Sequence, residues 1–184
     1  MTIVVQMWAA AAGIGHVDCE HVVQGTLAQP VLAVTSVAYV IVGLAVLALA
    51  ASARGALAAA AGVVLVAVGA GSVIYHGPQP TWAGAAHDWP IIAMGVVYAI
   101  GLAFTVRREW RVWLAAIAIL AIALIAYVAG RSGSPLCQPA SLWQFHGAWH
   151  VLSAAAAGLA ALAMARHAVL VRVESAQRVA AGGQ

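Results

Sequence analysis

The sequence contains no lysine and few charges of either sign, which sets it apart from ordinary soluble domains. Of its 184 residues, 7 % are charged and 65 % are hydrophobic, and its eight basic residues, all arginines, stand against five carboxylates. The mean hydropathy is +0.99. About 25 % of the residues of a soluble domain are charged, so the scarcity of charge excludes that class. The arginines form no basic stripe, and we expect no nucleic-acid partner.

Five long apolar segments predict an all-α integral membrane protein, a bundle of about five transmembrane helices. We place them roughly at residues 31–52, 56–76, 83–106, 112–130 and 145–166, each near the ~20 residues that cross the hydrocarbon core. Small residues are abundant in all five segments and would let the helices pack closely in lipid.

The other parts of the chain flank this transmembrane domain, which we assign to residues 31–167. Residues 1–30 are expected to form an extracytoplasmic or interfacial segment. The stretch over 3–15 is too short to span a membrane, and it lacks the basic region of a signal peptide. Residues 168–184 are the only plainly water-compatible stretch, so we predict a partly disordered cytoplasmic tail there.

The distribution of the arginines predicts the orientation of the bundle. In a five-span chain, seven of them lie on connections that share one side, and only Arg131 lies on the other. The seven are Arg54, Arg107, Arg108, Arg111, Arg166, Arg172 and Arg178. The positive-inside rule then places the N-terminus outside and the C-terminus in the cytoplasm. The lysine-free composition, rich in alanine, valine and arginine, indicates a bacterial plasma membrane.

The two cysteines, Cys19 and Cys137, both fall on the outer side in this orientation. An oxidising compartment would favour a disulfide between them, which would tie the N-terminal segment over the outer end of the bundle. Two free, partly buried thiols are the alternative.

Polar residues gather at the outer ends of the apolar segments in two motifs. The first is Ser72-Val-Ile-Tyr-His76 followed by Asp88, and the second is His146-Gly-Ala-Trp-His150. A spacing of four places the polar pair of each motif on one helical face, and the short turn after His76 brings Asp88 to a similar depth. A polar group inside an apolar bundle costs free energy unless it is paired or binds a metal. These five side chains therefore indicate one site.

The chemistry of this set suits a catalytic zinc ion. Three neutral imidazoles from two helices would leave a fourth coordination position open. Asp88 would take a proton from the zinc-bound water, and Ser72 would orient the water or hydrogen-bond the developing oxyanion. Zinc, hydroxide and one carboxylate sum to a charge near zero, which makes their burial tolerable.

Each of these residues also has a simpler interpretation. A single membrane histidine often hydrogen-bonds a neighbouring helix, and Ser72 could bond to a carbonyl one turn earlier. His87 points about 100° away from Asp88 on a helix, so we expect it at the rim of the site rather than among the ligands.

The order of these motifs resembles the alkaline ceramidase family. That family belongs to a wider group of zinc-dependent integral membrane hydrolases, which includes the adiponectin and progestin receptors. The matching pieces are Cys19-Glu20, Ser72, His76, Asp88 and His146-Gly-Ala-Trp-His150. The cysteine–glutamate pair before the first span favours the ceramidase branch.

The resemblance implies a zinc ion held by His76, His146 and His150. Asp88 and Ser72 would act on the water and the substrate, and the reaction would be hydrolysis of an amide bond in a lipid such as ceramide. The family has seven spans where this sequence predicts five. A smaller bundle would accept a different lipid or complete its pocket as a homo-oligomer.

A further departure concerns calcium, which ceramidases bind through several N-terminal acidic and polar residues. Only Asp18 and Glu20 remain of such residues here, which argues against a bound calcium ion.

Two other function classes stay open. A haem-binding electron-transfer protein would need paired histidines facing across the bundle. A non-catalytic receptor or transport protein would use the same residues to bind a metal structurally or to relay protons.

Overall fold

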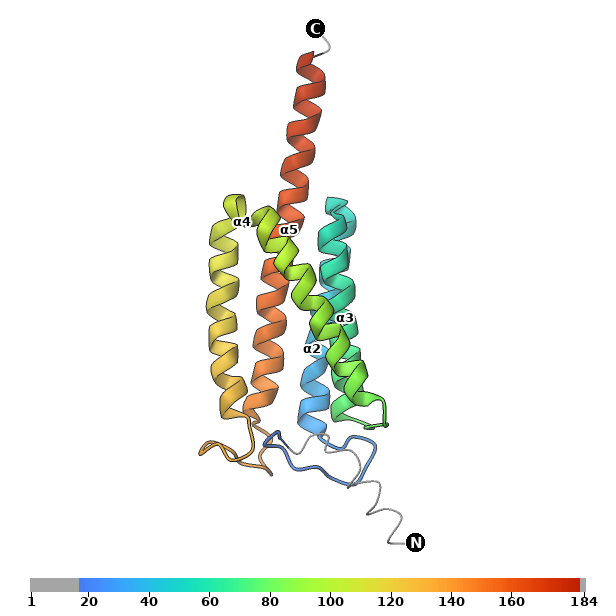
Figure 1. The fold of residues 1–184 in the computed structure, drawn as a ribbon, viewed down its shortest axis with the longest axis vertical. Coiled ribbons are helices and arrows are strands. Elements are labelled where there is room, and N and C mark those ends of the chain that lie inside the picture. Colours follow the sequence, from blue (N-terminus) through green and yellow to red (C-terminus); the bar gives the residue numbers. More distant parts are fainter. Residues whose placement is uncertain (1–16, 183–184) are drawn as a thin grey trace.

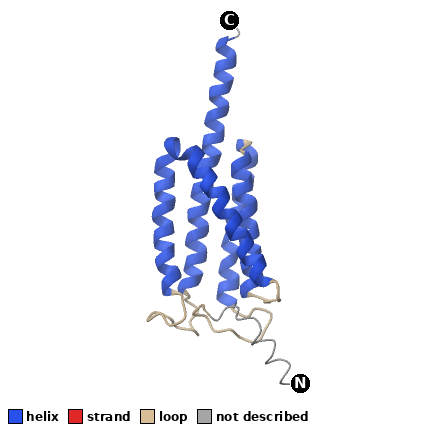
Figure 2. Ribbon diagram, viewed as in Figure 1, coloured by secondary structure: helices blue, strands red, loops and turns tan. Residues whose placement is uncertain are grey.

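The computed structural model describes residues 17–182 as a bundle of long helices with its loops gathered mainly at one end (Figures 1 and 2). The helices are α2 (Pro30–Ala53), α3 (Ala56–His76), α4 (Ala83–Ala129) and α5 (Phe145–Gly182). All four are long and apolar enough to cross a membrane. The described part of the chain is thus that of an all-helical integral membrane protein. The interfacial position predicted for residues 3–15 lies outside the described residues.

The predicted third and fourth spans are joined in one helix, α4, which bends at Glu109. Glu109 has φ −112° and ψ 27°, outside the helical region. Figure 1 shows the arm before the bend (green) and the arm after it (yellow) running in opposite directions. The expected count of five separate membrane-spanning helices is therefore corrected to four within residues 17–182. The arginine-rich segment around the bend stays helical, where the sequence analysis placed a loop.

The bend follows from the length of α4 and from a buried acid. A straight helix of 47 residues would be about 70 Å long, more than twice the thickness of the hydrocarbon core. Glu109 is buried at the bend, and its carboxylate lies 3.2 Å from the Arg166 guanidinium of α5. Next to it, the Trp113 indole donates to Thr105 at 2.8 Å. The first contact attaches the bend to α5, and the second joins the two arms of α4 to each other.

Helix α5 extends further than the sequence indicated. It continues without a break to Gly182, whereas we placed the end of the last span at residue 166 and a partly disordered tail after it. The added stretch contains no proline, and its glycines come at the end, so nothing in it stops a helix. An ion pair between Glu174 and Arg108 connects this extension to α4.

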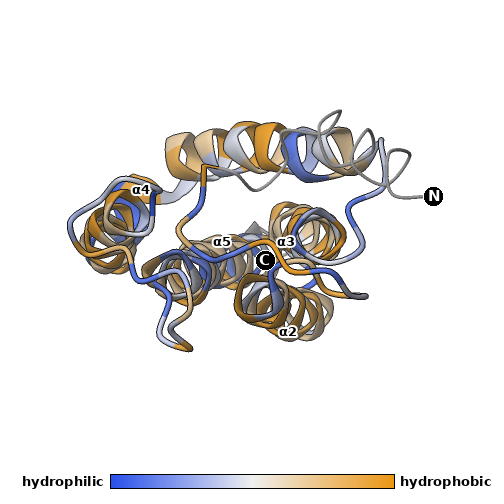
Figure 3. Cartoon of the chain, turned by 90° about the horizontal axis from the view of Figure 1, so that it is seen from below, coloured by the Kyte–Doolittle hydropathy of each residue, from blue (hydrophilic) through white to orange (hydrophobic). Residues whose placement is uncertain are grey.

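The packed interior is built from small residues, and large apolar side chains face outward. Ala58 and Ala61 of α3 are fully buried, whereas Phe104 and Ile125 of α4 are 71 % and 70 % exposed. Figure 3, viewed from the loop end, shows hydrophobic colours over much of the helices. Such a surface suits lipid, where close packing of small residues holds helices together.

Two close approaches position the loop end of the bundle. A Cβ on Gly71 of α3 would collide with the Ala86 carbonyl in the first turn of α4. A Cβ on Gly130, at the end of α4, would collide with the backbone of His146. Glycine at these two points lets both ends of α4 approach the helices that carry the histidines.

Candidate metal centre

Three histidines converge at the loop end of the bundle. His76 is the last residue of α3, and His146 and His150 lie near the start of α5. All three are buried, and their potential ligand atoms lie within 4.8 Å of one another. The prediction that the two histidine motifs meet is therefore confirmed. Imidazole suits zinc, copper, iron and nickel, so the donors alone do not name the metal.

An oxygen atom contacts the Nδ1 atom of each of these histidines. The contacts are Gln29 Oε1 to His76 at 2.8 Å, Asp18 Oδ1 to His146 at 3.1 Å, and Thr35 Oγ1 and Ser36 Oγ to His150 at 3.1 and 3.3 Å. Outer partners of this kind set the ring orientation and the tautomer of metal-binding histidines.

The proton position on His150 follows from the other bonds of its partners. The Thr35 hydroxyl donates to the Val31 carbonyl at 2.8 Å, and the Ser36 hydroxyl donates to the Leu32 carbonyl at 2.7 Å. A hydroxyl has a single proton to donate, so the two oxygens accept from His150 Nδ1. The lone pair of His150 is consequently on Nε2.

The same reasoning applies to the ring of His76. The Gln29 amide nitrogen donates to the Glu20 carbonyl at 3.1 Å, which leaves Gln29 Oε1 to accept from His76. For His146, Asp18 Oδ1 lies 3.1 Å from Nδ1, but this nitrogen makes no hydrogen bond of good geometry within residues 17–182, so the contact does not fix its proton. The Nε2 lone pairs of His76 and His150 are thus available to a ligand, and His146 adds a buried nitrogen without a hydrogen-bond partner in the described residues.

These residues fit a metal ion. His76 Nε2 is buried and has no hydrogen-bond partner within residues 17–182. A buried lone pair without a partner costs free energy. One cation bound among the three histidines would satisfy this atom, with three nitrogen ligands and one open position, as in catalytic zinc sites.

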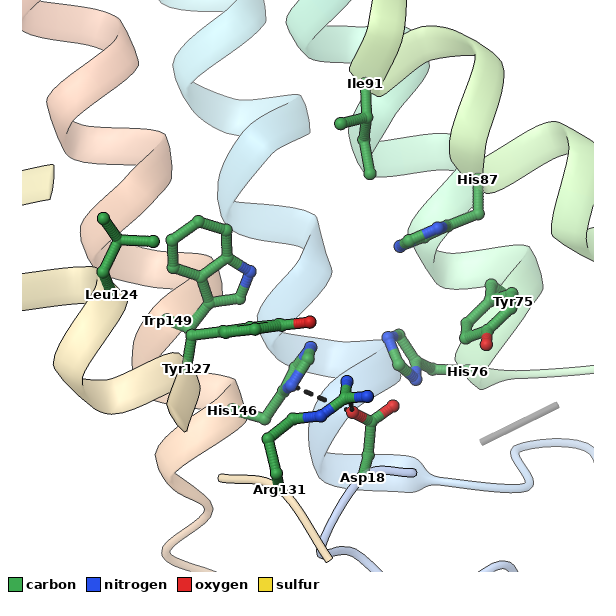
Figure 4. A pocket seen from close by; sticks show the side chains of 10 residues that line it. All are labelled: Asp18, Tyr75, His76, His87, Ile91, Leu124, Tyr127, Arg131, His146 and Trp149. Atoms are coloured by element: carbon green, nitrogen blue, oxygen red, sulfur yellow. Dashed lines mark hydrogen bonds and ion pairs between the residues drawn. The ribbon is translucent and has the colours of Figure 1, made fainter. Parts of the chain in front are cut away.

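A cavity of about 360 Å³ opens beside the histidines (Figure 4). It is lined by Asp18, Tyr75, His76, His87, Ile91, Leu124, Tyr127, Arg131, His146 and Trp149. His76 and His146 form part of its wall, so the cluster borders a space that can admit water and part of a larger molecule.

Asp18 contributes a negative charge to this cavity. Its side chain is 3 % exposed and lies 3.1 Å from Arg131 as well as from His146. Burial alone would raise the pKa of Asp18, but the contact with His146 and the nearby charges, including Arg131, hold its pKa below the ordinary value of 3.8. The carboxylate would offset part of the charge of a divalent ion.

Glu20 has a different role, at the start of α2. Its two carboxylate oxygens accept hydrogen bonds from the backbone amides of Val31 and Leu32 at 2.8 and 2.9 Å. Burial raises the pKa of Glu20, and the two amides oppose that rise. Asp18 and Glu20, considered above as remnants of a calcium site, are thus engaged with a histidine and with a helix end.

The structure places Asp88 differently from the sequence prediction. Its side chain is 71 % exposed, does not line the cavity, and accepts a hydrogen bond from His87 Nδ1 at 2.8 Å. His87 instead lines the cavity, with its ring stacked on Tyr75 and 6.2 Å from the His76 ring. The predicted depth is reasonable, but α4 is rotated so that the neighbouring residue faces inward.

Ser72 is buried one turn before His76 and does not line the cavity. A serine at this place can support α3 beside the site, and we do not assign it contact with a substrate.

Cys19 and Cys137 form a disulfide, with their Cα atoms 5.4 Å apart. Cys19 lies between Asp18 and Glu20, so the bridge holds the segment that supports both the metal centre and the start of α2. Backbone pairing between Asp18 and Arg131 runs beside it.

A second, nearly wholly apolar cavity of about 260 Å³ adjoins the first. Both arms of α4 and small residues of α5 form its walls. The lining includes Gly95 and Ala116 of α4 and Ala157 of α5. Trp149 lines both cavities. An apolar chain could therefore lie beside the polar centre without leaving the bundle.

The sequence reasoning missed Gln29, Thr35 and Ser36 as outer partners, and it missed Asp18 as the carboxylate beside His146. A signal for the first three was present, because polar residues within a membrane segment mark functional positions. No protein-family model, curated protein or solved structure matches this chain.

Proposed function

We propose that this protein is a zinc-dependent intramembrane hydrolase that cleaves an amide bond in a ceramide-like lipid. One observation carries the proposal. Three buried histidines place potential ligand atoms within 4.8 Å of one another, and two of them, His76 and His146, line a cavity. The order of the motifs, which resembles that of the alkaline ceramidases, supports the reaction class.

His76, His146 and His150 would hold the zinc ion. When bound, zinc would lower the pKa of a water molecule to about 7 and polarise a carbonyl group. Asp18 beside His146 and the hydroxyls beside His150 would keep the rings in place during the reaction.

We assign the proton-accepting role to His87, and Asp88 is its positioning residue. His87 reaches the cavity, and its Nδ1 atom is bonded to the Asp88 carboxylate. That bond leaves Nε2 free to take a proton from water and later to return one to the leaving amine. Asp88 thus acts through His87, where the sequence analysis had it accept the proton directly.

A lipid substrate is supported by the two adjoining cavities. The polar cavity would hold the amide group, and Figure 4 shows the Tyr127 hydroxyl directed into it, where it can donate to the substrate carbonyl. The apolar cavity past Trp149 would hold part of an acyl chain.

The haem alternative is disfavoured by the packing of the rings. The centroids of the three histidine rings lie 4.8 to 5.6 Å apart, which leaves no slot for a porphyrin between any two of them. A non-catalytic receptor is the competing proposal, and it differs by the absence of turnover.

Release of free fatty acid from ceramide and other N-acyl lipids by zinc-loaded protein in liposomes tests the reaction. Protein that carries zinc but cleaves none of these lipids would contradict the hydrolase and favour the receptor.

The proposed position of the acyl chain is tested at two glycines of α4, Gly84 and Gly95. A Cβ added at either glycine meets no atom within 4 Å. Gly95→Phe should fill the apolar cavity and raise KM for long-chain substrates about tenfold, with little effect on short-chain ones. Gly84→Phe is the matched control, because Gly84 lines neither cavity. Equal effects of the two variants would remove the apolar cavity from the substrate path.

A further inference from the structure

A third cavity lies at the end of the bundle opposite the histidines. It has a volume of about 370 Å³ and lies where the turn between α2 and α3 meets the α4 arm before Glu109 and α5. Its polar lining includes Arg54 and His167, and its apolar walls include Leu57, Phe104 and Val171. It shares no lining residue with the two cavities near the histidines.

Arg54 is the cation at this cavity whose charge is not matched by a neighbour. Nearby, Arg166 pairs with Glu109, Arg108 pairs with Glu174, and Arg172 donates to the Ala53 carbonyl. The ion pairs found within residues 17–182 do not include Arg54. The guanidinium is exposed at the cavity mouth and offers several donors to an oxyanion.

His167 supplies a second unmet polar atom at the same cavity. Its Nδ1 is buried and lacks a hydrogen-bond partner in the described part of the chain, although the ring as a whole is only partly buried. A buried polar atom without a partner is uncommon in folded proteins and calls for a bound group. Arg54 and His167 come from different segments and both line this cavity, so a single ligand can contact both residues.

The walls around these two groups indicate an amphiphilic ligand. Leu57, Phe104 and Val171 continue onto membrane-facing helices, and Phe104 is 71 % exposed. A free anion would gain nothing from such walls, whereas a lipid would place its phosphate at Arg54 and its chains along them.

We propose that this cavity binds the headgroup of an anionic phospholipid, with Arg54 and His167 as its polar contacts. The site is independent of the proposed hydrolase activity. It would fix the depth of the bundle in the membrane at the end opposite the metal centre.

Native mass spectrometry of the full chain in detergent, titrated with phosphatidylglycerol or phosphatidylcholine, tests this site. The wild type should bind phosphatidylglycerol about tenfold more tightly, the effect of one charge-assisted contact. Arg54→Gln should abolish the preference and Arg54→Lys should retain most of it. His167→Leu should reduce it about threefold.

The matched control is Arg178→Gln, which removes the same charge from an exposed position that does not line the cavity. If Arg178→Gln lost its preference for phosphatidylglycerol as fully as Arg54→Gln, the preference would come from general attraction between arginines and anionic lipid. That result would overturn the proposed site. Displacement of phosphatidylglycerol by excess inorganic phosphate would assign the cavity to a free anion and overturn the lipid. The unfolding midpoint of each variant shows whether the variant has lost structure in general. If Arg54→Gln does not fold, the threefold loss of lipid preference expected in His167→Leu still tests the site.

Discussion

The bend of α4 and the histidine cluster, near opposite ends of the bundle, treat buried polar groups differently. At the bend of α4, Glu109 meets Arg166, and the Trp113 indole donates to Thr105, so these groups satisfy one another. At the loop end, the oxygens around the histidines engage only Nδ1, and His76 Nε2 is left without a partner. The first arrangement stabilises a bend. The second leaves lone pairs for a ligand, which is what distinguishes a binding centre from a structural network.

The largest expected effect is loss of metal when one ligand is removed. His76→Ala, His146→Ala or His150→Ala should reduce the metal content of purified protein from about one ion per chain to near zero, because two imidazoles hold zinc far less well than three. Elemental analysis measures this and identifies the metal. His21→Ala is the matched control, since His21 is exposed and lies outside the cluster. If a variant with all three histidines replaced by alanine kept its metal, the metal site would lie elsewhere.

The next effect separates His87 from Asp88. His87→Gln should keep the metal and lower kcat by about 10²–10⁴, the range for removal of a general base. Asp88→Asn should also keep the metal and lower kcat less, because His87 would lose only its orientation. Steady-state kinetics with metal analysis on the same samples measures both, and Ser72→Ala should be the mildest of the three. A larger loss in Asp88→Asn than in His87→Gln would restore Asp88 as the direct acceptor.

Asp18 tests the outer contacts of the cluster. Asp18→Asn should weaken zinc binding about 10–100-fold, the usual effect of removing an outer partner of a ligand histidine. Competition with a chelator of known affinity measures the change. Glu20→Gln is a useful comparison, since Glu20 caps α2 and is expected to affect stability more than affinity. If wild type and Asp18→Asn bound zinc with equal affinity, the role of Asp18 would be limited to its ion pair with Arg131.

The pH dependence of the Asp18 contribution has a definite sign. Because its pKa is lowered in the folded protein, the stabilisation is fully present above the ordinary value of 3.8 and is lost only as pH falls through the lower folded value. Metal loss that begins at mildly acidic pH would come from protonation of the ligand histidines, so it should also occur in Asp18→Asn, at a higher pH because this variant binds zinc more weakly.

Some features of the fold and of the site could be predicted from the sequence, and others could not. His76, His146 and His150 were found because a spacing of four defines a helical face and the topology defines a depth. Rotation of a helix about its axis is set by packing, which the sequence does not reveal. Hence the sequence analysis placed Asp88 at the cavity where the structure has His87, and it did not foresee the contacts of Gln29, Thr35 and Ser36 with the histidines. The bend of α4 was read as a loop because charged residues interrupt an apolar pattern without interrupting a helix.

The smallest expected effect concerns the satisfied network at the bend. Glu109→Gln removes the charge that faces Arg166 and should destabilise the protein by about 1–3 kcal/mol, because a buried group loses its partner while Arg166, which is 58 % exposed, can turn to solvent. The metal content should stay at the wild-type level, since the bend lies far along α4 from the histidines. Unfolding in detergent with added denaturant measures the first quantity, and elemental analysis measures the second. If Glu109→Gln released the metal as readily as a ligand variant, the two ends of the bundle would be coupled, and the division between a structural network and a binding centre would not hold.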